Sequence, residues 1–441
     1  MRCAFAVRPP KIGSVNSSAT ANSRGFAAAY GIAHGGKSLF WHASELLFAY
    51  YLTEACALPP REMGFIVSAS LVLSALADLA AGLTLRYRVR SVMSAGRVQL
   101  LGAVLSGAAF AAFGLSSFVP QGLTRLVFAC GTLIAFRLTY ALLDNPQNAL
   151  LSLATSDEVQ GTRLTSIRYI FGGIANVMVA AAFAPLFGSG GVVAGSRGFA
   201  LFTLLVGSVS VVSSYGLWRY LRHFQSKPGR VAIPTSHCLP APPTYRLGPV
   251  VLMLFFVSVA MSVFSRLEPY FAAYGMRSVL QGGVLLTCVA AGNLVSQPFW
   301  ARLAAGSSLQ TTLRGSMVWV AAAAAVFEIL IDLGPVGTAL GGILFGWGCG
   351  GVLMSLWALA AAAGQRNSNP TIIFGVLTCA SKMALALAAA GVAEVLNATP
   401  YRTHTAALAW ILPCMIAAPI VASAASLILS SSVKVGSPIY R

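Results

Sequence analysis

The chain has 441 residues, of which 57% are hydrophobic and only 9% are charged, and its mean hydropathy is +0.77. A soluble domain carries about 25% charged residues, so this composition excludes a soluble globular protein and indicates a polytopic membrane protein. The formal net charge of +18 would suggest a nucleic-acid partner for a soluble protein. Here the basic residues are explained by their distribution between the two sides of the membrane, as described below, and no nucleic-acid partner is expected.

Twelve apolar stretches follow one another along the chain, each near the ~20 residues that a helix needs to cross a bilayer. We therefore predict an all-α protein of twelve transmembrane helices surrounded by lipid bilayer. The predicted spans are residues 30–55, 64–85, 93–116, 127–153, 161–187, 199–221, 248–272, 279–303, 312–333, 336–361, 371–396 and 406–430.

The basic residues are distributed unequally between the two sides that these spans define. Nineteen of the 29 Lys and Arg residues fall in the segments on the side of both termini or at the span ends next to them, five fall in the opposite connections, and five lie deeper within the spans. Cytoplasmic segments of membrane proteins are enriched in Lys and Arg. Both termini are therefore predicted to be cytoplasmic, in a multi-pass protein of the inner (plasma) membrane.

Two hydrophilic segments indicate the domain organisation. Residues 1–29 are basic, rich in Ser and Asn and without the apolar core of a secretory signal, so we predict a disordered cytoplasmic tail. The Pro-rich segment 223–247 divides the spans into six and six. We predict an N-terminal half (30–222), a cytoplasmic linker (223–247), a C-terminal half (248–430) and a cytoplasmic tail (431–441). Two six-helix halves are the layout of the major facilitator fold, and a monomer is expected.

Charges within the fourth and fifth predicted spans need an explanation, because a charge at the centre of a membrane helix costs about 2.5–3.5 kcal/mol. Asp144 lies 13 residues before Asp157, which marks the turn, and Arg168 lies 11 residues after it. At about 1.5 Å per residue the two side chains reach similar depths and are predicted to pair across a helical hairpin. The pair is interpreted either as an inert brace or as the lining of a wet cavity. A buried ion pair stabilises little compared with apolar packing, which favours the cavity.

The same region carries a family resemblance. The stretch YALLDNPQNALLSLATSD followed by GTRLTSIR resembles the helix four to five signature of the glycoside–pentoside–hexuronide:cation symporters (melibiose-permease-like). YGIAHGGKSLFW resembles the first helix of that family, and the lysine in LTCASKMALALAAAGV is similar to its lone lysine of helix eleven. The residues that fill the pattern are Tyr140, Asp144, Pro146, Asp157, Arg163, Arg168 and Lys382.

This resemblance implies a secondary active transporter and not an enzyme. It implies alternating access for a sugar or a related small polar solute, without a cofactor or a metal site. Asp144 would accept hydrogen bonds from sugar hydroxyls and Arg168 would donate to neighbouring ones. The resemblance places Tyr140, Asn148 and Lys382 at the substrate as well. Asn148 stands where melibiose permease has a tryptophan, so this position has no ring on which a sugar could stack.

The expected cation site departs from the family pattern. The family has two acids four residues apart on its second helix, whereas here Asp78 fills the second place and Ser74 the first. On the polar face of helix one, Lys37 is followed by Ser38 where the family has an acid. A sodium site uses several oxygen ligands, whereas a proton needs one carboxylate, so we predict proton-coupled symport through Asp78. Sodium-coupled or uncoupled transport of a non-sugar solute is the alternative.

Glu45 adds a second acid to the first predicted span. It lies three residues after His42 and shares a helical face with Lys37. Glu45 and His42 could titrate near neutral pH and relay protons. Alternatively, Glu45 compensates the charge of Lys37 or Lys382.

Further charges lie near these spans. Arg137 precedes Asp144 by seven residues on a similar helical face, and Arg266 with Glu268 is interpreted as an interfacial pair near the end of span seven. The connection GLTLRYRVRSVMSAGR resembles the superfamily's cytoplasmic gating loop, so we assign Arg86, Asp157 and Arg163 to gating. The alternative is that the arginines only mark topology.

Gly342, Gly346 and Gly350 in GGILFGWGCGG have a four-residue spacing that permits close helix packing in membranes. The stretch lacks the strand and the Lys-Ser/Thr of a phosphate loop, so nucleotide binding is rejected. Catalytic motifs such as HExxH and GxSxG are also missing from the sequence, which argues against an intramembrane enzyme. A membrane sensor or scaffold is the non-transport alternative.

Overall fold

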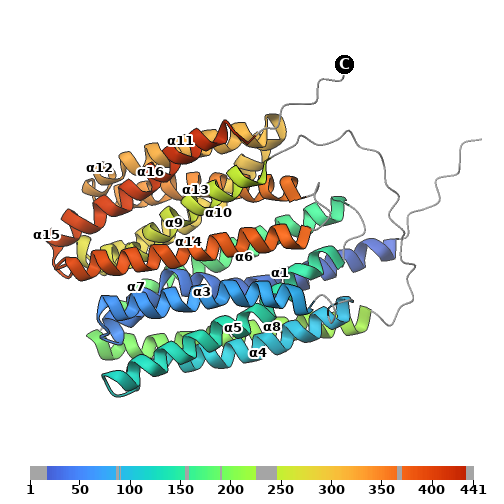
Figure 1. Cartoon of the computed structure of the whole chain (residues 1–441), viewed down its shortest axis with the longest axis horizontal. Coiled ribbons are helices and arrows are strands. Elements are labelled where there is room, and N and C mark those ends of the chain that lie inside the picture. Colours follow the sequence, from blue (N-terminus) through green and yellow to red (C-terminus); the bar gives the residue numbers. More distant parts are fainter. Residues whose placement is uncertain are drawn as a thin grey trace, which may run out of the picture.

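The computed structural model describes residues 17–85, 89, 91–153, 158–188, 191–224, 246–364 and 370–433, and every regular element in these ranges is helical. Figure 1 shows the N-terminal helices (blue to green) in the lower part of the bundle and the C-terminal helices (yellow to red) in the upper part. We call helices α1 to α8 the N-terminal set and helices α9 to α16 the C-terminal set.

The elements are α1 (Ser17–Leu46), α2 (Phe48–Tyr50), η1 (Tyr51–Ala55), α3 (Pro60–Leu85), α4 (Val92–Gly114), η2 (Ser116–Phe118), α5 (Leu123–Leu153), α6 (Glu158–Ala181), α7 (Phe183–Phe187), α8 (Gly191–Phe224), α9 (Leu247–Tyr270), η3 (Phe271–Gly275), α10 (Val279–Gly306), α11 (Leu309–Ala325), α12 (Phe327–Asp332), α13 (Pro335–Gly364), α14 (Pro370–Ala398), α15 (His404–Ala406), η4 (Ala407–Ile411) and α16 (Leu412–Ser430).

Ten helices of the described residues are long and apolar enough to cross a membrane, from Pro60–Ala81 to His404–Ser430. The protein is therefore a multi-pass membrane protein. The other two predicted spans, 30–55 and 312–333, do not meet the same test. The first carries several polar side chains and ends in the π-helix η1, and the second is divided into α11 and α12 at Val326.

The first helix begins earlier than predicted. α1 starts at Ser17, so the prediction of a disordered tail over residues 1–29 is wrong for residues 17–29. The segment SSATANSRGFAAAYG is rich in Ala, which has the highest helix propensity of all residues, and the helix therefore extends beyond the apolar span. The first 16 residues, most of the predicted linker (225–245) and the last eight residues lie outside the described part of the chain.

The two sets of helices meet mainly along two pairs of neighbours. α3 packs against α14, and α6 packs against α10. Across the first pair, the Ser68 hydroxyl donates to the Ala386 carbonyl oxygen at 2.8 Å. These contacts place α1, α3, α5, α9 and α14 around the middle of the molecule, where the charged side chains lie.

The predicted glycine packing is confirmed within the C-terminal set, where α13 packs closely against α10. A Cβ atom at Gly346 would lie 2.0 Å from the Val289 carbonyl oxygen, and one at Gly350 would lie 2.3 Å from the Ser296 hydroxyl oxygen. Since lipid supplies no hydrophobic driving force between helices, close backbone contact of this kind is what holds membrane helices together.

This packing predicts opposite effects for two substitutions of glycine by alanine. Gly346→Ala forces two backbones apart and should lower stability by about 1–3 kcal/mol. Gly391→Ala on α14 meets no atom within 4 Å and should raise stability by up to about 1 kcal/mol, because alanine is the better helix former. Thermal unfolding of the purified variants in detergent measures both effects, and an equal change in both would contradict the packing argument.

Candidate functional site

The first polar group in the middle of the bundle joins α1 to α5. Lys37 Nζ lies 2.5 Å from Asp144 Oδ1 and 3.5 Å from Asn148 Oδ1. The Asn148 amide donates to Asp144 Oδ2 at 3.0 Å. Lys37 is buried, whereas the Asp144 side chain keeps 21% of its surface exposed. The carboxylate is therefore held by two partners and still accessible to a small molecule.

The predicted ion pair between Asp144 and Arg168 is wrong, because no such pair occurs among the described residues and Lys37 takes its place. Arg168 on α6 interacts electrostatically with Asp144 and with Tyr30. Residue number fixes the depth of a side chain in the membrane but not the neighbour that it faces. α6 packs mainly against α1 and α10, so α1 supplies the partner of Asp144.

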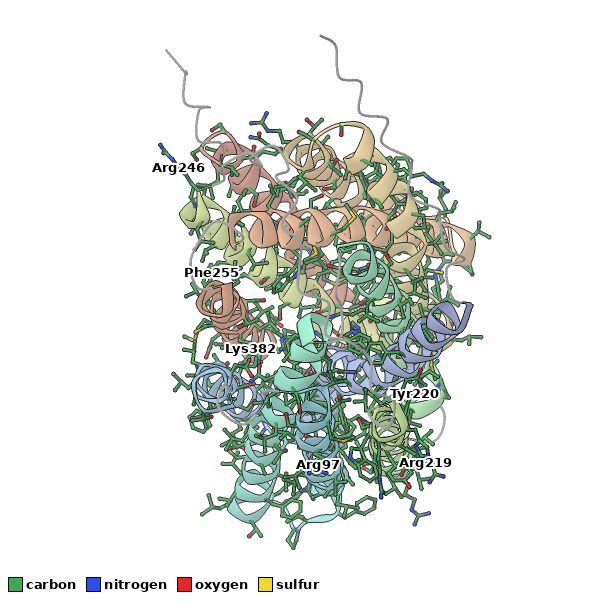
Figure 2. All side chains as sticks on the ribbon, turned by 90° about the vertical axis from the view of Figure 1, so that its right-hand side faces the viewer. Arg97, Arg219, Tyr220, Arg246, Phe255 and Lys382 are labelled. Atoms are coloured by element: carbon green, nitrogen blue, oxygen red, sulfur yellow. The ribbon has the colours of Figure 1, made fainter. Side chains whose placement is uncertain are left out.

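The second group joins α3 of the N-terminal set to α14 of the C-terminal set. Lys382 forms an ion pair with Asp78 and donates to the Ser74 hydroxyl at 2.8 Å. Figure 2 shows Lys382 between the two sets. Among the described residues, Asp78 Oδ1 has no hydrogen-bond partner although it is buried. The structure thus brings together a residue predicted to bind substrate and the residue predicted to couple transport to a cation.

The third group lies around Glu45. Its two carboxylate oxygens are 3.2 Å from Arg137 on α5 and 2.7 Å from Arg266 on α9. Arg266 is fully buried, so its interpretation as interfacial is wrong. Glu45 compensates these two arginines and not Lys37 or Lys382, because helices far apart in the sequence converge at this depth.

The remaining predicted residues of α1 and α5 line the same region. The Tyr140 ring stacks on Trp41 with a centroid distance of 6.4 Å. The Ser38 hydroxyl donates to the His34 carbonyl oxygen of its own helix at 2.8 Å. His42 interacts with the backbone of Gly172 on α6, and no hydrogen bond or ion pair joins it to Glu45.

The residues predicted to form the gating contacts lie wholly or partly outside the described part of the chain. Arg86 and Asp157 are not among the described residues, and the Arg163 side chain is not described although its backbone belongs to α6. Their role in gating stays a prediction.

Sequence reasoning missed a polar cluster at one end of the bundle, which we call the Glu54 end. Glu54 in η1 accepts hydrogen bonds from Tyr274 at 2.5 Å and from Tyr401 at 2.8 Å, and its carboxylate lies 3.2 Å from the Arg402 guanidinium. The three partners belong to the C-terminal set or its connections, so the cluster joins the two sets.

Two further features distinguish the Glu54 end, where the two sets of helices are joined. The Thr53 and Tyr270 hydroxyls lie 2.7 Å apart across the same boundary. Both sets of helices contain a π-helical turn there, η1 in the N-terminal set and η3 in the C-terminal set. π-turns occur often at functional sites, and these two occupy the ends of the first helices of the two sets. The only sequence signal was a further acid, Glu54, at the end of the first predicted span.

A membrane bundle with ion pairs inside it, both within the N-terminal set and between the two sets, is typical of a membrane transporter. The chain belongs to the MFS/sugar transport protein family, whose model matches residues 29–436. It is also similar to the putative glycoside/cation symporter YagG of Escherichia coli (strain K12), with 29% identity over 159 residues. That match spans about a third of YagG, 34% of its length and 36% of this chain.

Solved structures support the same fold. A bacterial homologue of the iron transporter ferroportin in the outward-facing state has a TM-score of 0.60 and 14% identity, over 93% of this chain and 99% of its own. The peptide transporter POT in complex with alafosfalin has a TM-score of 0.65 and 10% identity, over 92% and 94% of the two chains. The nucleoside transporter NupG has a TM-score of 0.59 and 12% identity, over 92% and 97%. At such identities the likeness concerns the fold alone.

The Glu54 cluster predicts that Glu54→Gln opens this end of the protein. The substitution removes the charge from three hydrogen-bonded contacts, and hydrogen bonds to charged groups contribute about 1.5–3 kcal/mol each. Cys56 reports the opening, because it is buried beside the cluster and burial raises the pKa of its thiol to about 12. In protein whose other cysteines are replaced by serine, we expect maleimide to alkylate Cys56 at least about tenfold faster in Glu54→Gln.

Glu62→Gln is the matched control for this experiment, since it removes an acid on the same side without an ion pair of the described residues. Equal alkylation rates for Cys56 in Glu54→Gln and in Glu62→Gln would contradict a closing role for the cluster.

Proposed function

We propose that the protein is a proton-coupled symporter that carries a sugar or a related small polar solute by alternating access. It would act as a monomer in the inner membrane, with twelve transmembrane helices in two six-helix halves and both termini in the cytoplasm. The accessible Lys37–Asp144–Asn148 group is the observation that carries the proposal. Membership of the sugar transport family and the partial likeness to YagG support it.

The chemistry of this group suits a polyol. Asp144 offers acceptor oxygens, and Lys37, Asn148 and Arg168 offer donors, so neighbouring hydroxyls can each find a partner. Charge-assisted hydrogen bonds are about twice as strong as neutral ones. The Trp41 and Tyr140 rings beside the group supply an apolar surface for one face of a sugar ring.

The Asp78–Lys382 pair suits proton coupling, because it bridges the two sets of helices. A proton added at the unpartnered Asp78 Oδ1 would neutralise the carboxylate and weaken its attraction for Lys382. The equilibrium between two conformations shifts when a ligand binds one of them better. A proton that weakens a contact between α3 and α14 would therefore favour their separation. Glu45 offers no comparable site, since each of its oxygens is held by an arginine.

Alternating access requires that one end closes while the other opens. The hydrogen bonds of Glu54 and Thr53 would close the outer face in this conformation, with the opposite end, where Arg246 lies, in the cytoplasm (Figure 2). Transport would then break these polar contacts, which water can replace, while the close apolar packing inside each set persists.

Substitutions at the proposed sugar site should abolish binding without unfolding the protein. Asp144→Asn keeps the size of the side chain but removes its charge, and Arg168→Gln removes a donor. Each should weaken binding of the transported solute by about 100-fold, as measured by thermal stabilisation in a solute screen. The exposed Asp332→Asn and Arg277→Gln are charge-matched controls. Unchanged affinity in either site variant would refute the assignment of that residue.

Coupling should depend on the Asp78 carboxylate. In proteoliposomes, an inward proton gradient should stimulate solute uptake, and Na⁺ should have no effect. Asp78→Asn should lose the stimulation but keep solute exchange, because the conformational cycle does not need the proton to be released. Ser74→Ala removes the other partner of Lys382 and should stay coupled. Strong stimulation by Na⁺ at fixed pH would exclude the proton mechanism.

A further inference from the structure

The last turns of α8 carry a group of basic and aromatic side chains, which we call the α8 basic group. Its members line a hollow of about 340 Å³ and are Tyr215, Trp218, Arg219, Arg222 and His223. Residues three or four positions apart are neighbours on a helix surface, so the group occupies one face of α8. The membrane span of this helix ends at His223. The group therefore lies where α8 leaves the hydrocarbon.

Other side chains of the same turns fasten α8 to two neighbouring helices. The Tyr220 ring lies 6.4 Å from the Phe26 ring of α1. On another side of the helix, a Cβ atom at Gly96 of α4 would lie 2.8 Å from the Leu221 side chain. The α8 basic group is consequently turned away from the bundle, and Arg219 lies toward its outside (Figure 2).

Contacts within the group order its side chains. The Arg222 guanidinium carbon lies 5.8 Å from the centroid of the Trp218 ring, and the Trp218 and Tyr215 rings are 5.6 Å apart. His223 Nδ1 lies 2.8 Å from the Arg219 carbonyl oxygen. A guanidinium that stacks on an aromatic face keeps its N–H groups available for an anion. Side chains that are already ordered lose less entropy when a ligand binds.

The helices around the α8 basic group bring no carboxylate to it. α4 and α8 contain no acidic residue. The acid of α1, Glu45, lies 19 residues after Phe26, which is about 28 Å along the helix. α4 instead adds the exposed Arg97, next to Gly96. A basic pocket among membrane helices is the kind of site that binds an anionic lipid headgroup.

An exposed apolar stripe along α8 favours a lipid over a soluble anion. Leu201, Leu205 and Val212 are 67%, 63% and 67% exposed, and their spacing of four and seven residues places them on the face that carries Arg219. From Leu205 to Arg219 this face is about 21 Å long at 1.5 Å per residue. Half of the hydrocarbon core measures about 15 Å, so an acyl chain can follow the stripe while its headgroup reaches the arginine.

We propose that the α8 basic group binds the headgroup of an anionic phospholipid, one acyl chain of which lies along Leu205 and Val212. The phosphate accepts hydrogen bonds from Arg219 and Arg222, and the two aromatic rings of the group lie at headgroup level, where such rings are enriched. In the orientation proposed above this end is cytoplasmic, and the cytoplasmic leaflet carries anionic lipids. The proposal goes beyond the transport function and does not depend on the solute.

Two lipids with identical acyl chains test this proposal on the full chain. Native mass spectrometry of the delipidated protein would compare dioleoylphosphatidylglycerol with dioleoylphosphatidylcholine, and inorganic phosphate would be added as a competitor. The first phosphatidylglycerol molecule should bind at least about tenfold more tightly than phosphatidylcholine, because two arginines attract its net charge. Inorganic phosphate at the same concentration should not displace it, since phosphate lacks the acyl chain.

Variants locate the lipid on α8. Arg219→Gln and Arg222→Gln should each weaken the binding of phosphatidylglycerol about fivefold and leave that of phosphatidylcholine unchanged. Arg302→Gln, at an exposed position near the end of α10, is the matched control and should leave both affinities unchanged. All three arginines are exposed, so the variants are expected to fold.

Three results would overturn the proposal, and none of them bears on sugar transport. Equal affinity for the two lipids would show that the headgroup is not recognised. Phosphatidylglycerol that binds equally well to the wild type and to both α8 variants would mean that Arg219 and Arg222 only mark topology. Displacement by an equal concentration of inorganic phosphate would identify the hollow as a site for a soluble anion.

Discussion

A charged side chain within an apolar span must find its partner inside the protein, because lipid offers none. The middle of this structure follows from that constraint. Lys37 and Asp144 join α1 to α5, Asp78 and Lys382 join α3 to α14, and Glu45 joins α1 to α5 and α9. Each charge is therefore also a connection between helices, and two of these three groups connect the N-terminal set to the C-terminal set.

The closest contacts within the C-terminal set and the polar contacts between the two sets differ in chemistry. Within the C-terminal set, α10 and α13 touch backbone to backbone at Gly346 and Gly350, which leaves no room for movement. Between the sets, the contacts include hydroxyls, carboxylates and guanidinium groups, as at Ser68, Thr53 and Glu54. Polar contacts can be exchanged for water at little cost, whereas tight apolar packing cannot. The polar contacts between the sets suit the proposed alternating access, although close packing also occurs there: a Cβ atom at Gly64 on α3 would lie 2.3 Å from the Ala393 side chain on α14.

The departure from the family pattern has a consistent physical result. The first and second helices have Ser38 and Ser74 where the resemblance leads us to expect acids. Lys37 and Lys382 consequently depend on single carboxylates, Asp144 and Asp78. Fewer acids beside the same basic residues leave more cationic than anionic side chains in these ion-paired groups.

The sequence by itself determined the class of protein, ten of the membrane helices, the glycine packing and most of the residues that lie in the middle of the bundle. Hydropathy, helix periodicity and the cost of burying a charge are local properties, so they can be read from neighbouring residues. The prediction from sequence was wrong at the start of α1, because the high helix propensity of alanine extends this helix beyond the apolar span.

Only the tertiary structure decided which charges meet. Depth in the membrane follows from residue number, but the direction in which a side chain points depends on how distant helices pack. Asp144 and Arg168 have matched depths, yet α1 brings Lys37 to Asp144. Arg266 and Glu45 are 221 residues apart, and no local pattern in the sequence relates them. They pair because α9 and α1 come from different sets and meet in the middle of the bundle, where each charge needs a partner.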